Sequence, residues 1–401
     1  MMHNDLEPGK TKKKDCLQHA MWTLATSRSS QFQVYECKLY AKTRQLFQAF
    51  EPEETCHHLC SELAQAWTLL AIYELTCQDF HRGLMSAGRA FRLIQMMRLY
   101  ELDAPQTTPN MQLEQCPGIV HLQDPVQEDW IDLESKRRTF WLAYTIDRFT
   151  SMVDGLHMFF DEHLIRTRLP ASEVNFVNGL STNMRFLADV ISGDDIRCTD
   201  GDLSPFAESA IAAAICGRVL EHKQKPPSKL QDFCSRHRSL YALLGQRIDL
   251  LQIYASLEYP DPLIAFATLG AHVSVLMLYE LAESRPLGSE AQGMRLTQAL
   301  SAEHKQQSLD AVDDAALVVT VLGQHFQVHP LTPILLLLGG RFSQSHPGFN
   351  NAYVKLIPGI MTTLQAFYGL NKVAEDFIEL LKSGNEKYNY FSQTEVPMSM
   401  Q

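Results

Sequence analysis

The chain has 401 residues, of which 45% are hydrophobic and 20% are charged, and its formal net charge is −11 at pH 7. This length suits one large domain or two ordinary ones, and the composition is normal for a soluble globular protein. A compact domain that binds DNA by itself usually carries a basic face, because phosphate contacts dominate its affinity. The acidic balance therefore argues against a stand-alone DNA-binding domain, although it leaves room for a local basic patch.

The N-terminal residues are polar and include four lysines, Lys10, Lys12, Lys13 and Lys14. They lack the apolar core of a secretory signal peptide. We expect residues 1–14 to form a disordered basic tail, and two interpretations stay open: a solvated tail, or a nuclear import signal or part of a basic linker. The nine cysteines are scattered and odd in number, which indicates reduced thiols in a nuclear or cytosolic protein.

Helical spacing of apolar residues begins before residue 103. The repeat consists of Phe80, Leu84, Ala87, Phe91, Ile94 and Met97. Residues 103–129 contain four prolines and a glycine, which predict a long loop between helices.

The segment 133–170 predicts one amphipathic helix, a glycine stop and a short acidic loop that ends in Leu-Pro. Glu134 and Arg138 stand four residues apart, which places them on one helix face. We expect the opposite stripe to be buried, and it consists of Phe140, Trp141, Tyr144, Phe149 and Met152. Gly155 suits the left-handed position that ends a helix.

In the second half of the chain, three helices are predicted to begin with a cap residue followed by proline. These starts are Ser204-Pro205, Asp261-Pro262 and Thr332-Pro333. Helical periodicity also marks two amphipathic segments, 240–255 and 370–380. Polar breaks at residues 192–202, 224–229 and 282–292 predict the loops between these helices.

Residues 262–279 form an almost unbroken apolar stretch with His272 near its middle. Its length is close to the minimum for a membrane span, which needs roughly 17–25 residues. A histidine at this depth is costly in lipid, so a buried central helix of a helical core is the favoured interpretation. We expect no membrane association.

Strand alternation is nearly absent, so the predicted fold class is all-α: a single large irregular helical domain. No internal repeat and no linker interrupts the chain. We expect this domain to cover residues 15–382 and a flexible tail to cover residues 383–401.

The segment 133–170 resembles the middle homology region of fungal binuclear zinc cluster transcription factors. The matching positions, in order, are Glu134, Arg137, Arg138, Phe140, Trp141, Asp147, Arg148, Gly155, Asp161, Leu169 and Pro170. Residues 69–102 and 206–222 are also similar to segments of that family, and the likeness extends over roughly residues 17–382. The resemblance implies the fungal transcription factor type of helical fold, with these residues in a structural or regulatory role.

The resemblance also implies an N-terminal module of six clustered cysteines that hold two zinc ions. Such a module needs cysteine pairs a few residues apart. No C-x-x-C spacing occurs among the cysteines, which are Cys16, Cys37, Cys56, Cys60, Cys77, Cys116, Cys198, Cys216 and Cys234. We therefore expect no cofactor in this chain, with zinc only in a missing N-terminal cluster. A regulator without its own DNA-binding module and a truncated gene product both stay open.

Other motifs offer weaker candidates for chemistry. Cys56-His57-His58-Leu59-Cys60 and the pair His325/His329 have partial metal-ligand spacing, but each lacks the remaining ligands. Asp194-Asp195 and Asp313-Asp314 lack the third aspartate of a magnesium–diphosphate motif. We expect no catalytic, cofactor-binding or metal-binding residues, and no enzymatic activity.

These observations lead to one main hypothesis. The chain is a nuclear transcription regulator of fungal type that acts through other transcription factors or co-regulators, with indirect DNA contact and a possible small-molecule effector. Control of a secondary-metabolite biosynthesis gene cluster follows from the resemblance. The alternatives are a metabolite-sensing or scaffold protein without a promoter role, and an all-α enzyme. The oligomeric state stays open.

Overall fold

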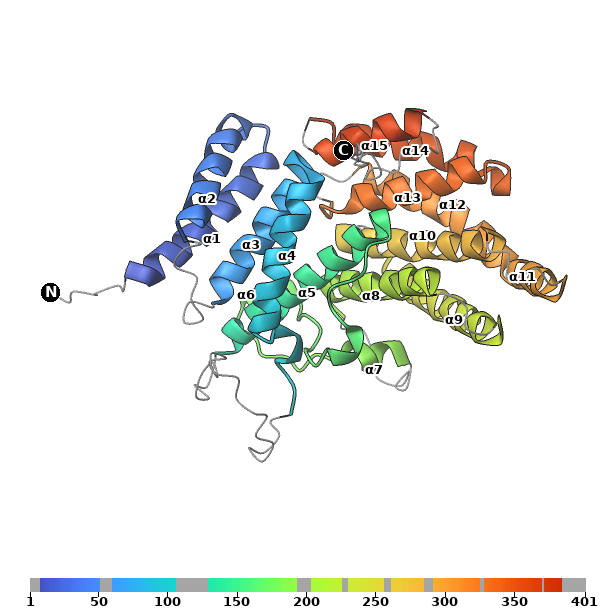
Figure 1. The fold of residues 1–401 in the computed structure, drawn as a ribbon, viewed down its shortest axis with the longest axis horizontal. Helices are drawn as coiled ribbons and strands as arrows, with labels where there is room; N and C mark the ends of the chain where they lie inside the picture. The colour runs from blue at the N-terminus through green and yellow to red at the C-terminus, as the bar shows by residue number, and fades with distance from the viewer. Residues whose placement is uncertain are drawn as a thin grey trace, which may run out of the picture. The chain divides into compact units, whose positions relative to one another are not determined.

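The computed structural model describes residues 8–50, 60–105, 129–192, 203–225, 230–255, 261–284, 291–324, 328–369 and 371–383. These residues form helices joined by loops (Figure 1), and within them a single antiparallel bridge, between Arg168 and Phe186, is the one β-type pairing. The predicted all-α fold class is confirmed. The chain divides into two compact units, which are described in turn.

Unit 1 comprises residues within Met1–Ile146 and Phe159–Ala207. Its helices are α1 (Pro8–Ser27), α2 (Glu36–Phe50), α3 (Ser61–Tyr73), α4 (Phe80–Met96), most of α5 (Trp130–Asp154), α6 (Glu173–Val177) and α7 (Leu187–Ser192). Single turns are η1 (Gln33–Tyr35), η5 (Leu99–Glu101), η6 (Glu162–Leu164) and the π-helical η4 (Glu74–Gln78). Helix α1 packs against α2 and α3, and α3 packs against α4 (Figure 1).

A buried carboxylate in unit 1 is contacted by side chains of both α2 and α4. Glu74, in the π turn, is fully buried and accepts hydrogen bonds from the hydroxyls of Ser86 and Tyr40. The Arg44 guanidinium lies 3.1 Å from the same carboxylate. Burial raises the pKa of Glu74, and these three partners oppose that shift. The π turn is a local widening of the helix that directs this side chain inward.

Unit 2 comprises residues within Asp147–Met158 and Glu208–Gln401. Its helices are α8 (Pro205–Gln224, from Glu208 onward), α9 (Leu230–Ala255), α10 (Pro262–Ser284), α11 (Ala291–Glu303), α12 (Lys305–Leu322), α13 (Thr332–Ser345), α14 (Ala352–Ala366) and α15 (Lys372–Ser383). The 3-10 turn η7 (Phe349–Asn351) precedes α14. Helix α10 contacts α9, α11, α12 and α13, and is therefore the central helix of this unit (Figure 1).

Helix α10 is the one helix in the described part of the chain that is long and apolar enough to cross a membrane, and 83% of its apolar window is buried in the protein. The predicted buried central helix is confirmed. Small residues let its neighbours approach closely. A side chain added at Gly270 would lie 3.7 Å from Cys216 of α8 and Leu335 of α13. Close packing of this kind stabilises the unit through apolar burial.

Two of the three predicted helix starts are confirmed. The Ser204 hydroxyl accepts a hydrogen bond from the Ala207 N–H at 3.0 Å, and the Asp261 carboxylate accepts one from Leu263 at 2.8 Å. The third helix also begins at the predicted Thr-Pro pair, with proline in its first turn, but its cap differs. Leu331 is the residue before α13, and the Thr332 hydroxyl donates to the His329 carbonyl at 2.7 Å instead of capping the helix.

The basic N-terminus also differs from the prediction. Residues 8–14, expected to belong to a disordered tail, form the first turns of α1. Pro8 suits the first helical position, and lysine is a good helix former, so local propensity favours helix here despite the charge. The expected loop at 103–129 and the expected tail at 383–401 lie almost wholly outside the described residues, and the predicted domain boundaries stay a prediction.

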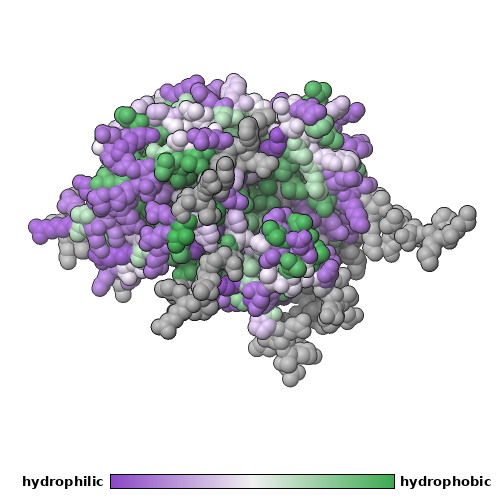
Figure 2. Space-filling view, turned by 180° about the vertical axis from the view of Figure 1, so that it is seen from behind, coloured by the Kyte–Doolittle hydropathy of each residue, from purple (hydrophilic) through white to green (hydrophobic). Residues whose placement is uncertain are grey.

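Hydrophilic and hydrophobic residues are interspersed on the surface. On the face in Figure 2, hydrophilic residues predominate and hydrophobic residues form smaller groups between them. One exposed apolar group in unit 1 lies at the turn between α1 and α2, where Phe32, Val34 and Tyr35 are 48%, 87% and 56% exposed. Three exposed large hydrophobic side chains in four residues offer an apolar contact surface.

Unit 2 buries two histidines next to each other. The Nε2 atom of His222 lies 3.2 Å from Nδ1 of His237, and Phe233 stacks against both rings. Burial, and then the neighbouring His222, His304 and Arg238, lower the pKa of His237 to about 3. This ring is therefore neutral in the folded protein at pH 7.

Replacement of His237 by leucine should flatten the pH dependence of stability. The unfolded chain binds a proton at position 237 below about pH 6.5, and the folded chain does not, so stability is lost as the pH falls. Between about pH 7.5 and about pH 5.5 the wild-type protein should lose about 1.4 kcal/mol more than His237→Leu. Urea denaturation at both pH values measures this difference, and identical pH dependences would contradict a neutral buried ring.

Candidate functional site

Helix α5 carries most of the residues that sequence analysis singled out. Its aromatic stripe is buried as predicted, with Phe140, Trp141, Tyr144 and Phe149 at 0% exposure and Met152 at 5%. The rings of Phe140, Trp141 and Tyr144 contact one another edge-on or tilted. This arrangement buries one face of α5 in the apolar interior. Charged residues of α5 instead form ion pairs and hydrogen bonds.

The charged residues at the start of α5 form a carboxylate–arginine network, which comprises Asp103, Glu134, Arg137, Arg138 and Arg168. Glu134 is fully buried, and its Oε1 accepts the backbone N–H of Ala171 at 2.8 Å. Arg137 and Arg138 each approach the same carboxylate at 3.4 Å, which confirms the predicted pairing of Glu134 with Arg138. Buried charges are stable only when they are paired and hydrogen-bonded in this way.

Arg137 joins α5 to the segment that follows α4. Its Nε donates to Asp103 Oδ2 at 3.0 Å, and its Nη2 contacts the other oxygen of that carboxylate. Burial by itself lowers the pKa of Arg137, but the hydrogen bonds and charges of Asp103 and Glu134 together outweigh burial and raise the pKa. Asp103 also accepts the backbone N–H of Arg168 at 2.9 Å, so one carboxylate holds two separate segments.

The Leu169-Pro170 loop is held by backbone contacts. The indole N–H of Trp141 donates to the Arg168 carbonyl at 2.7 Å, and the Ser204 hydroxyl donates to the Pro170 carbonyl at 2.8 Å. Leu169 and Pro170 are buried. The loop that closes the family-like segment is therefore fixed by α5 and by the cap residue that precedes α8.

Arg138 continues the network toward the surface. It donates to Glu173, which is 71% exposed, at 2.6 Å, and to the Ala171 carbonyl at 3.0 Å. Its guanidinium also lies over the Phe176 ring, 4.2 Å from the centroid. Asp161 is exposed and caps η6 through the N–H of His163.

Three predicted residues belong to unit 2 and do not join the network. Asp147 and Arg148 pair with each other at 2.6 Å, and both are buried. A side chain at Gly217 of α8 would lie 2.6 Å from the Arg148 stem, so glycine makes room for the arginine. Gly155 has the predicted left-handed backbone, with φ of +67°. The Leu156 N–H donates to the Ser151 carbonyl at 3.1 Å and completes the helix cap.

The weaker metal and catalytic candidates are scattered. Cys56, His57, His58, His325 and Asp194-Asp195 lie outside the described residues. His329 stacks on Phe266 at 4.0 Å, and Asp313 pairs with Lys355. Within the described ranges, no three His, Cys, Asp or Glu side chains are grouped so that they could hold a metal ion.

Sequence analysis missed three members of this site. Asp103 and Arg168 complete the network, and Glu173 extends it, but none belongs to the helical pattern that drew attention to α5. Asp103 is 34 residues from Arg137, and four prolines between them interrupt any helical spacing. No local spacing rule could have paired them.

Comparison with known proteins relates the chain to a protein family. The profile of the fungal specific transcription factor domain matches residues 4–257. The pigment biosynthesis transcriptional activator pigB of Monascus ruber is 34% identical over 386 residues, which cover 93% of this chain and 66% of the relative. No solved structure matches the chain.

Two further curated relatives have similar names. The transcription factor tazR of Aspergillus terreus is 31% identical over 388 residues, which cover 92% of this chain and 56% of the relative. The citrinin biosynthesis transcriptional activator ctnR of Monascus purpureus is 32% identical over 386 residues, which cover 93% and 62%. The chain thus spans roughly 56–66% of the length of these three relatives.

Replacement of Trp141 by alanine should destabilise the protein strongly. The change removes a fully buried indole and its hydrogen bond, so the free energy of unfolding should fall by about 3–5 kcal/mol. Trp22→Ala is the matched control, because Trp22 is 45% exposed, and it should change stability by less than about 1 kcal/mol. Guanidinium denaturation measures both, and near-wild-type stability of Trp141→Ala would contradict the packing of α5.

Replacement of Asp103 by alanine should also be costly. Arg137 would stay buried without its main carboxylate partner, at a cost of about 3–5 kcal/mol. Glu173→Ala is the control, because it breaks a largely exposed ion pair worth about 0–1 kcal/mol. The double variant Asp103→Ala/Arg137→Ala should lose less stability than the sum of the single variants. Strictly additive losses would show that the two side chains are not coupled.

Proposed function

This chain belongs to the fungal specific transcription factor domain family, and on that premise we propose that it is a nuclear transcription regulator of a secondary-metabolite biosynthesis gene cluster. The observation that carries the proposal is the 34% identity with a pigment biosynthesis activator over 93% of this chain. A citrinin biosynthesis activator matches over the same share. Both relatives are named for the pathway whose genes they activate.

The chain regulates through protein contacts, and DNA contact is indirect. A net charge of −11 opposes close approach to phosphates unless a basic patch compensates it. The carboxylate–arginine network supports a structural role for the family-like segment, because its charges are used in pairing α5 with loops. The exposed group Phe32, Val34 and Tyr35 supplies a surface of the kind that protein partners cover.

The proposal assigns no enzymatic activity and no cofactor to this chain. The charged residues at the start of α5, Glu134, Arg137 and Arg138, form ion pairs and hydrogen bonds within the protein. A general acid, base or nucleophile instead needs a reacting atom within hydrogen-bond reach in a substrate pocket. The network residues are therefore suited to hold a fold rather than to perform a reaction.

Deletion of the gene in the source organism tests the function directly. Transcript sequencing should show a coordinated fall in a small set of neighbouring biosynthetic genes, because the named relatives are activators. Reintroduction of the wild-type gene should restore those transcripts, and a fluorescently tagged chain should enter the nucleus. Unchanged transcripts together with a tagged protein that stays outside the nucleus would overturn the proposal.

A further inference from the structure

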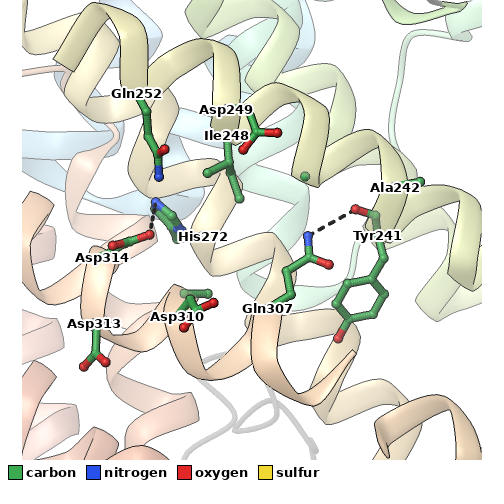
Figure 3. A pocket seen from close by; sticks show the side chains of 12 residues that line it. Tyr241, Ala242, Ile248, Asp249, Gln252, His272, Gln307, Asp310, Asp313 and Asp314 are labelled. Atoms are coloured by element: carbon green, nitrogen blue, oxygen red, sulfur yellow. Dashed lines mark hydrogen bonds and ion pairs between the residues drawn. The ribbon is translucent and has the colours of Figure 1, made fainter. Parts of the chain in front are cut away.

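Helices α9, α10 and α12 of unit 2 surround a partly open cavity of about 610 Å³ (Figure 3). Small-molecule sites in proteins typically occupy roughly 300–1,000 Å³, so this volume suits a metabolite. On the α9 side, Tyr241, Gly245, Ile248 and Gln252 recur at intervals of three or four residues and present one helix face to the cavity.

The cavity is acidic, and most of that charge is uncompensated. Four aspartates line it, Asp249, Asp310, Asp313 and Asp314, and none of its described lining residues is a lysine or an arginine. Among the four, and within the described structure, only Asp313 has a cationic partner of fixed charge, Lys355 of α14. Asp310 accepts a hydrogen bond from the Gln306 amide at 2.8 Å, which leaves its charge in place. Like charges gathered in this way attract a cation.

His272 of α10 is an unsatisfied polar group at the inner end of this cavity. The side chain is 2% exposed, and its Nδ1 has no hydrogen-bond partner in the described structure. Its Nε2 faces the Asp314 carboxylate at 4.0 Å, which is longer than a hydrogen bond (Figure 3). Burial lowers the pKa of His272 to about 4, so the neutral ring does not offset the aspartates.

The remaining lining favours an organic molecule over a bare ion. Ala242, Ile248 and Ala311 contribute apolar surface beside the Tyr241 side chain. No group of three candidate metal ligands occurs in the described ranges, so the aspartates are not arranged as a metal centre. A lining that joins apolar surface to charged groups can contact both the body and the head group of an organic cation.

We propose that this cavity binds a small organic cation, a protonated amine attached to an apolar body. The ammonium group pairs with Asp310 and Asp314, and the body lies against the apolar side of α9. The neutral ring of His272 supplies a nitrogen that accepts a hydrogen bond from the ligand. The proposed binding follows from the geometry of the cavity and does not depend on the proposed function. Only an effect of the ligand on transcription rests on the proposed function.

Three probes that share a 4-hydroxyphenyl ring and differ in charge test the charge requirement. Isothermal titration calorimetry of the full chain should detect saturable binding of tyramine. N-Acetyltyramine, which keeps the ring but has no charge, should bind at least about tenfold more weakly, equivalent to about 1.4 kcal/mol. 4-Hydroxyphenylacetate, which carries a negative charge, should not bind.

Variants locate the binding site. Asp314→Asn keeps the shape of the side chain and should weaken tyramine binding at least about fivefold, since a charge-assisted contact is lost. Asp310→Asn changes the second proposed partner of the ammonium at an exposed position, and it should also weaken binding if Asp314→Asn fails to fold. Asp132→Asn, an exposed position at the start of α5 in unit 1, is the matched control and should leave binding unchanged.

Three results would each overturn the proposal: no saturable binding of tyramine at millimolar concentration, equal binding of N-acetyltyramine, or wild-type affinity in both folded aspartate variants. Each result concerns the purified protein only. A failure here therefore leaves the transcript measurements on the deletion strain unaffected, and the two proposals can fail separately.

Discussion

The buried carboxylate of Glu134 is the charge on which the arrangement of unit 1 depends. Removal of an ion from water costs several kcal/mol unless new partners replace its hydration. Glu134 obtains those partners from three places: the Ala171 N–H, Arg137 and Arg138. The loop can leave α5 only if a buried charge loses its hydrogen bond, so helix and loop keep one relative position.

Arg137 and Asp103 extend the same constraint to the segment after α4. Asp103 binds the Arg137 side chain and the Arg168 backbone together, which makes the two loops dependent on each other. Truncation of one partner leaves the other buried and unpaired, so such networks tolerate few single changes. This dependence gives a physical reason for a family-like order of acidic, basic and aromatic residues in the segment 133–170.

The central helix α10 of unit 2 is packed in a different way, mainly through apolar side chains. Helix α10 approaches its neighbours through small residues such as Gly270, and its stability comes from apolar burial rather than from ion pairs. His272 and the aspartates around it are polar exceptions to this apolar packing. In unit 1 the buried charges of the network are balanced inside the protein, whereas most of the exposed or half-buried aspartates that line this cavity have no fixed cation beside them in the described structure. An uncompensated acidic cavity beside an apolar helix is suited to an external cation.

The sequence alone determined the all-α class, the buried stripe of α5, the Gly155 cap and the family, because these depend on periodicity, local conformation and residue order over short distances. It missed the cap of α13, which is Leu331 rather than Thr332, and the helical conformation of residues 8–14, where neighbouring contacts and helix propensity compete over one or two turns. Only the tertiary structure decided that Glu134 binds the Ala171 backbone, that Arg137 binds Asp103, and that Asp314 meets His272. Asp103 and Arg137 are 34 residues apart, and Glu134 and Ala171 are 37 apart. Contacts at such separations arise from chain packing, and no sequence spacing encodes them.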